Sequence, residues 1–210
     1  MFKTEDLEVI AKRVVAAAAL AALSTATLSW LGAYRAPRER AVAPGRRLLG
    51  LSAWAQFASG LSVLALLVGL GRALWVPIPL PIGKRRAQTL GGTAVSFSLV
   101  GIILVPWTRI ALGTMFGVST SFAARLRVGH RLARQGPYAL VRHPLYLGYL
   151  LLLLSAALAY RTWSAVALLA IGIATFLGRV RREEAALAAE FGSEWPDYAA
   201  RTSCLIPFVY

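Results

Sequence analysis

The chain has 210 residues, of which 58% are hydrophobic and 15% are charged, whereas a soluble domain averages nearer ~25% charged residues. The apolar residues fall into blocks, the pattern of an integral membrane protein. The formal net charge of +14 has the sign expected of cytoplasmic loops, which lie near anionic lipid head groups. The sequence shows no interleaving of basic and aromatic residues that would indicate nucleic-acid binding. The single cysteine, Cys204, allows no internal disulfide, and two histidines without a cysteine cluster argue against a metal site.

The apolar blocks lie at about residues 14–31, 48–70, 89–116 and 145–177. Acidic residues precede the first block, so we expect a retained helix and not a cleaved signal peptide. Between the second and third blocks, alternating prolines from Trp75 to Arg86 forbid a helix and predict an extended interfacial loop. Pro106 and Arg109 interrupt the third block and predict a kink or a shift to the interface.

The last apolar block, 145–177, has 33 residues, too many for one span and few for two, since each span needs roughly 20 residues. It is broken near Tyr160 to Trp163, which predicts a tight helical hairpin with slightly short arms. The expected fold is therefore an all-α integral membrane protein with about five transmembrane helices and a cytosolic C-terminal amphipathic helix. We expect a single membrane domain, 1–210, with three spans in 1–117 and a cofactor-binding core in 118–210.

The distribution of lysine and arginine predicts the orientation of these spans. The loops 34–47 and 117–143 and the C-terminal tail hold fourteen of these residues on one side, against eight in the N-terminus, in the 72–86 loop and at Arg161. The positive-inside rule then places the C-terminal tail in the cytoplasm.

Two polar clusters on that side flank the predicted hairpin. The first extends from His130 to Gly148, and its residues 136–148 read Gly-Pro-Tyr-Ala-Leu-Val-Arg-His-Pro-Leu-Tyr-Leu-Gly. The second, residues 179–184, reads Arg-Val-Arg-Arg-Glu-Glu. Pro144 suits the first position of a helix, so His143 lies at a helix N-terminus, where free N–H groups favour an anion. Arg179 and Glu183 are four residues apart and share a helix face. A hairpin returns both of its ends to one side of the membrane, so it brings the two clusters together.

Each cluster alone also has a simpler interpretation. Arg142 and His143 suit head-group contacts, and Tyr138 and Tyr146 suit an interfacial aromatic belt. An exposed pair of arginine and glutamate on one helix contributes only ~0.3–0.5 kcal/mol and is common. The two clusters in order, joined by a hairpin, favour a ligand site.

The combined pattern resembles the isoprenylcysteine carboxyl methyltransferase family and the related membrane phospholipid methyltransferases. The residues that carry it, within about 128–208, read Gly136-Pro-Tyr-x-x-Val-Arg-His-Pro-x-Tyr-x-Gly148, Arg179-x-x-x-Glu-Glu-x-x-Leu187 and Phe191-Gly-x-x-Trp-x-x-Tyr198-x-x-Arg201. The chain reads His-Arg-Leu-Ala at 130–133 where relatives read His-x-Leu-Val, and it has no counterpart near Ala123 of a glutamine that contacts the cofactor in some relatives.

The resemblance implies a multi-helix membrane core and a cytoplasm-facing pocket for S-adenosyl-L-methionine. It implies a substrate-orienting role for Arg179 and support from Arg142 and Glu184. The residues implied to bind the cofactor are His130, Arg131, Leu132, Ala133, Tyr138, His143, Pro144, Leu145, Tyr146 and Glu183.

We therefore expect a membrane methyltransferase, in a bacterial inner membrane, that acts on a lipophilic small molecule or lipidated substrate. A carboxylate acceptor is favoured by Arg179, and a phospholipid amine or a small thiol stays open as the acceptor. The other classes are an NADPH-dependent reductase of the sterol type and a non-enzymatic membrane protein. No metal and no nucleic acid is expected as a partner.

Overall fold

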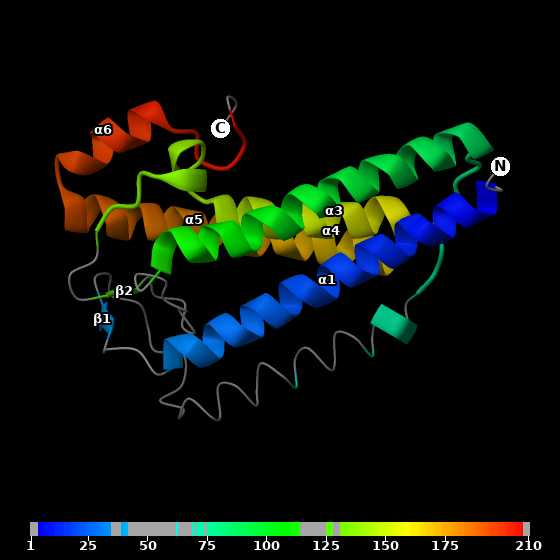
Figure 1. Ribbon diagram of the computed structural model, residues 1–210, viewed down its shortest axis with the longest axis horizontal. Helices are drawn as coiled ribbons and strands as arrows, with labels where there is room; N and C mark the ends of the chain where they lie inside the picture. Colours follow the sequence, from blue (N-terminus) through cyan, green and yellow to red (C-terminus); the bar gives the residue numbers. More distant parts are fainter. Residues whose placement is uncertain are drawn as a thin grey trace.

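The computed structural model describes residues 4–34, 39–41, 62, 69, 71–73, 75–113, 125–127 and 131–207, and Figure 1 shows their arrangement. Nearly all of the predicted second span, 48–70, and the predicted site residue His130 lie outside the described residues. Within the described part, three helices are long and apolar enough to cross a membrane, so the chain is an integral membrane protein. They are α1 (Thr4–Tyr34), α3 (Lys84–Leu112) and α5 (Trp163–Phe191).

The shorter elements complete the described fold. The apolar helix α4 (Pro144–Tyr160) lies between α3 and α5 in sequence, and α6 (Glu194–Arg201) follows α5. A 3-10 turn, η2 (Gly136–Ala139), precedes α4, and two short strands, β1 (Glu39–Ala41) and β2 (Arg125–Arg127), pair antiparallel. The all-α prediction is therefore right for the membrane helices and incomplete for this strand pair.

Helices α3 and α4 approach each other closely through glycines. A Cβ built on Gly101 would lie 2.8 Å from the Leu152 Cγ atom and 2.9 Å from the Gly148 carbonyl oxygen. Small residues at such positions let two membrane helices approach until their backbones nearly touch. This contact fixes α4 against α3, while α1 packs against both helices.

The predicted hairpin of α4 and α5 is present, and its tip lies within the predicted break. Arg161 adopts a left-handed conformation with φ of 52° at the end of α4. The side chain of Thr162 then accepts a hydrogen bond of 3.3 Å from the Ala165 N–H and caps the start of α5.

The prediction of two slightly short arms is wrong for the second arm. Helix α5 does not end near Leu177 but continues without interruption to Phe191. The charge that begins at Arg179 marks the end of the apolar segment, not the end of the helix. Arginine, glutamate and alanine are all good helix formers, so the helix continues through them.

The loops lie at the two ends of the bundle in the grouping that the charge distribution predicted. At one end, Pro77 forms an isolated bridge with Thr162, and Arg161 pairs with Glu8 at 2.6 Å. The proline-rich loop, the start of α1 and the hairpin tip therefore lie together. At the other end, β1 and β2 join the two arginine-rich loops, on the same side of the bundle as α6 (Figure 1).

The proline-rich loop and the third span agree with the sequence in outline. Residues 75–83 are irregular and extended as predicted, but α3 already begins at Lys84. Helix α3 contains Pro106 within its length and ends at Leu112, so the span lies a few residues earlier in the chain than the apolar block.

Candidate functional site

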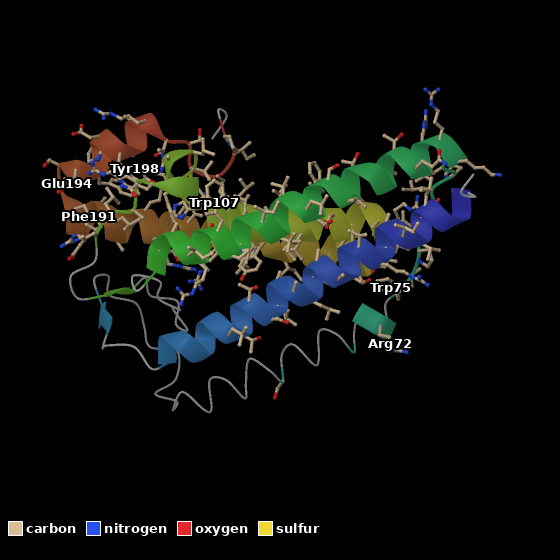
Figure 2. All side chains as sticks on the ribbon, in the orientation of Figure 1. Arg72, Trp75, Trp107, Phe191, Glu194 and Tyr198 are labelled. Carbon is tan, nitrogen blue, oxygen red and sulfur yellow. The ribbon has the colours of Figure 1, made fainter. Side chains whose placement is uncertain are left out.

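The candidate site lies where α4 begins and where α5 carries its charged residues, a region called the hairpin foot from here on. Its residues are Arg142, His143, Tyr146, Arg179, Glu183 and Glu184. Figure 2 labels Phe191, Glu194 and Tyr198 at this end of the molecule, opposite Arg72 and Trp75.

The segment before α4 is held in shape by a turn and by proline. Gly136 has a φ of 62°, in the left-handed region that favours glycine, and opens η2. A Cβ at this position would lie 3.3 Å from the Trp107 Nε1 atom of α3, so the turn packs closely on that helix. Pro144 is the first residue of α4, as predicted, and His143 immediately precedes it.

Glu184 forms the more buried of two polar groups at the hairpin foot. Its Oε1 atom accepts a hydrogen bond of 2.6 Å from Arg142 Nε and lies 3.2 Å from His143 Nε2. The Cys204 Sγ atom lies 3.7 Å from the same oxygen. The side chain of His143 is only 5% exposed and that of Arg142 13%, so this charge cluster is largely removed from solvent.

Glu183 forms the second polar group, one residue earlier on α5. Its Oε1 atom accepts a hydrogen bond of 2.5 Å from the Tyr146 hydroxyl and one of 3.2 Å from Arg179. Arg179 Nε donates a further hydrogen bond of 2.9 Å to the Tyr146 oxygen. The Glu183 Oε2 atom lies 3.8 Å from His143 Nδ1, which links the two groups through the imidazole. The predicted Arg179–Glu183 pair is therefore present.

Aromatic rings stack beside these polar groups. The rings of His143 and Tyr146 have centroids 5.8 Å apart, and those of Tyr146 and Phe176 lie 5.1 Å apart, each pair inclined by 18°. The Arg179 guanidinium lies 5.8 Å from the centre of the Tyr146 ring. The stack gives the site apolar ring faces next to charged groups.

The segment after α6 closes the site from outside the hairpin. The Arg142 and His143 N–H groups donate to the carbonyls of Ser203 and Cys204 at 2.9 and 3.1 Å. The Arg142 guanidinium also donates to the carbonyls of Ala199 and Thr202, the former at 2.9 Å. The C-terminal segment is therefore fastened to the start of α4 by both backbone and side chain.

Sequence patterns alone did not predict this contribution of the C-terminal segment. Trp195 and Tyr198 are buried on α6, and the Tyr198 hydroxyl donates to the Tyr138 carbonyl at 2.8 Å. Trp195 also lies against the Arg142 guanidinium, 5.9 Å from its ring centre. Their spacing with Arg201 was part of the family resemblance, but only the tertiary structure brings Cys204 next to Glu184.

Burial governs the acid–base behaviour of this end of the molecule. Burial, reinforced by the nearby charge of Glu184, raises the pKa of the Cys204 thiol to about 11. Burial also raises the pKa of Tyr198 to about 12 and that of Tyr138 further. Burial alone would lower the pKa of Arg142, but its hydrogen bond and ion pair with Glu184 raise it instead. All four groups therefore keep their protons at neutral pH.

The remaining residues named from the sequence lie around this centre. Arg131 is exposed, and Leu132 and Ala133 are half-buried in the irregular segment before η2. Leu145 packs against the apolar cluster of Ala18, Ala22, Val105 and Leu152, on the side of α1 and α3. Their predicted contacts with a cofactor stay predictions.

Comparisons with known proteins match the part of the chain that contains this site. Residues 94–189 match the model of the isoprenylcysteine carboxyl methyltransferase (ICMT) family. This range includes the six residues of the hairpin foot. Residues 94–189 are therefore ICMT-like. The resemblance seen in the sequence is therefore confirmed.

Two relatives extend the comparison. The cobalt-zinc-cadmium resistance protein CzcN of Cupriavidus metallidurans is 34% identical over 101 residues, which is 44% of this chain and 47% of that protein. A solved structure of the eukaryotic intramembrane Ras methyltransferase ICMT matches with a TM-score of 0.52 and 18% identity, over 76% of this chain and 55% of that one. Over the matched part the chain thus shares the fold of that enzyme, and it spans about half the length of either relative.

Proposed function

We propose that the protein is an S-adenosyl-L-methionine-dependent methyltransferase that acts on a lipophilic, membrane-embedded acceptor. The observation that carries the proposal is the meeting of two charged clusters across the hairpin. Two carboxylates, two guanidiniums and one imidazole gather beside a helix N-terminus at the end of the apolar segment. Ionisable groups gathered and paired at the end of a membrane helix commonly mark a binding site.

The residues present fit the amino-acid part of this cofactor. Glu183 has a side chain 29% exposed; Tyr146 and Arg179 bind its Oε1 atom, and its Oε2 atom can accept an ammonium group. The free N–H groups in the first turn of α4, after His143, suit a carboxylate. The ring face of Tyr146 offers a surface that attracts a positively charged sulfonium. Once bound, the cofactor supplies a methyl group on sulfonium that a nucleophile attacks directly.

The acceptor proposed first is a carboxylate of the isoprenylcysteine type. Arg179 pairs with Glu183, and its side chain is 31% exposed. Its guanidinium can therefore orient a carboxylate. A carboxylate is already a nucleophile and needs no general base. The residues would therefore act mainly by aligning the acceptor with the cofactor and by excluding water.

The relatives leave the acceptor class open to experiment. One of them is described as a Ras methyltransferase, and the other is described by metal resistance and names no acceptor. A phospholipid amine and a small thiol are therefore tested beside the carboxylate. We also propose that the hairpin foot faces the cytoplasm of a bacterial inner membrane, on the arginine-rich side of the bundle.

The direct test of the proposal is whether the protein binds S-adenosylhomocysteine, the product that the cofactor becomes after methyl transfer. Calorimetry on the purified, detergent-solubilised protein should detect the binding of S-adenosylhomocysteine. Glu183→Ala should weaken this binding by about 10–100-fold, because it removes one charge-assisted hydrogen bond. Glu194→Ala is the matched control, because Glu194 lies on α6 outside the hairpin foot and forms an exposed pair with Arg134. Absence of binding to the wild-type protein would overturn the proposal, and a nicotinamide fluorescence titration then tests the reductase alternative.

Methyl transfer itself identifies the acceptor. Membranes that overproduce the protein are given cofactor with a labelled methyl group and an S-prenylated cysteine analogue, phosphatidylethanolamine or a lipophilic thiol. A carboxyl methyl ester releases its label in mild base, whereas N-methyl and S-methyl products keep it. Label that resists base would refute the carboxylate acceptor and retain the methyltransferase.

A further inference from the structure

Three side chains with metal-binding atoms meet at the inner edge of the hairpin foot. They are His143 from the start of α4, Glu184 from α5 and Cys204 from the segment after α6. One ligand atom from each lies within 4.8 Å of the other two. His143 is 6% exposed and Cys204 5% exposed, and Glu184 is half-buried, so the cluster is enclosed by the fold.

The separations within the cluster suit a tetrahedral ion. Zinc lies about 2.0–2.2 Å from nitrogen or oxygen ligands and about 2.3 Å from sulfur, so ligand atoms of a tetrahedral site lie about 3.3–3.7 Å apart. His143 Nε2 lies 3.2 Å from Glu184 Oε1, and Cys204 Sγ lies 3.7 Å from the same oxygen. Only small side-chain movements would therefore centre an ion between the three atoms.

The surrounding groups resemble the outer shell of a metal site. A metal-binding histidine usually directs its second ring nitrogen at a carboxylate, and a metal-binding carboxylate usually accepts a further hydrogen bond. Here His143 Nδ1 faces Glu183 Oε2 at 3.8 Å, and Arg142 donates to Glu184 at 2.6 Å. The positive charge of Arg142 opposes a cation, but Glu183 supplies a second negative charge on the other side of the imidazole.

We propose that His143, Glu184 and Cys204 bind a divalent transition-metal ion of the zinc class. Imidazole and thiolate ligands favour zinc, cobalt or cadmium over magnesium or calcium. Three protein ligands leave a fourth position for water or for a small molecule. Binding of one ion converts the Cys204 thiol to a thiolate and releases one proton to solvent. This site goes beyond methyl transfer and reverses the expectation, drawn from residue counts, that the chain binds no metal.

Cobalt(II) absorption tests the site directly. The protein is purified without a histidine tag, freed of metal with a chelator and titrated with cobalt chloride. Because Cys204 is the only cysteine in the chain, a thiolate-to-cobalt charge-transfer band in the near ultraviolet can arise only from it. We expect one cobalt ion per chain, a band that zinc abolishes and no band in Cys204→Ser.

The controls separate this site from surface binding. Asp197→Asn removes an exposed carboxylate of α6 and should keep the band. Cobalt binding without a charge-transfer band, or a stoichiometry of one ion per two chains, would overturn the proposal. If Cys204→Ser does not fold, the band of the wild-type protein and its loss with zinc decide the question alone.

A second measurement examines the relation to the cofactor. Because His143 and Glu184 also belong to the hairpin foot, metal and cofactor should compete, a consequence that rests on the proposed function. At zinc concentrations ten times its own Kd, the apparent Kd of S-adenosylhomocysteine should rise about elevenfold. An unchanged Kd would refute the competition. Failure of S-adenosylhomocysteine to bind at all would instead concern the methyltransferase proposal, since the cobalt spectrum needs no cofactor.

Discussion

Arg142 offers the sharpest test of what holds the hairpin foot together. Its side chain, 13% exposed, pairs with Glu184 and also donates to two carbonyls at the end of α6. Removal of one partner from a buried ion pair costs about 3–5 kcal/mol. Glu184 is 27% exposed and regains part of its hydration. We therefore expect Arg142→Ala to lower the free energy of unfolding by about 2–3 kcal/mol.

A second arginine–glutamate pair in the same molecule provides the control. Arg134 and Glu194 lie 2.8 Å apart, but their side chains are 48% and 65% exposed. Exposed pairs contribute about 0–1 kcal/mol, so Arg134→Ala should change stability little. The two alanine variants therefore differ mainly in burial and in the carbonyl contacts of Arg142.

The assay is unfolding in mixed detergent micelles with increasing dodecyl sulfate, followed by circular dichroism. A double-mutant cycle with Glu184→Gln isolates the pairwise contribution, because the other contacts of each residue cancel. A loss below about 1 kcal/mol for Arg142→Ala, equal to that of Arg134→Ala, would refute the view that burial strengthens this pair.

Two further measurements examine packing and the buried thiol. Gly101→Ala forces a Cβ to 2.8 Å from Leu152 Cγ and should destabilise the protein by about 1–3 kcal/mol. Gly92→Ala, with open space around the added Cβ, should leave the stability unchanged. Equal thermal stability of the two variants would contradict the close approach of α3 and α4. The pKa of Cys204, raised to about 11 by burial and by Glu184, predicts slow alkylation at pH 8 in the presence of chelator, with a rate that rises up to about pH 11. A rate already at its plateau at pH 8 would contradict that prediction.

The sequence was sufficient where local rules decide the structure. The break at Arg161 and Thr162 follows from polar residues inside an apolar block, and the start of α4 follows from Pro144. The contact of Arg179 with Glu183 follows from helix geometry alone. These local features, with the hairpin, were enough to predict which two clusters meet.

The remaining features depend on interactions between distant segments, and local rules could not supply them. Nothing in the neighbourhood of Cys204 indicates that it lies beside Glu184, because that contact requires the backbone pairing of Val141 with Ser203. The continuation of α5 to Phe191 was missed for a different reason, since hydropathy reports the end of the apolar segment while backbone hydrogen bonding decides the end of the helix.

The shortness of α4 has a consequence for the surrounding membrane. Its 17 residues span about 25 Å, whereas the hydrocarbon core of a bilayer is about 30 Å thick. For α4 to span the membrane, the lipids against it would thin locally by about 5 Å, or water would reach into one end of the helix. The hairpin foot lies at one end of α4, so this distortion would bring the proposed lipid-borne acceptor and water to the same depth. We expect thicker bilayers to oppose that meeting, which would link the proposed methyl transfer to membrane thickness.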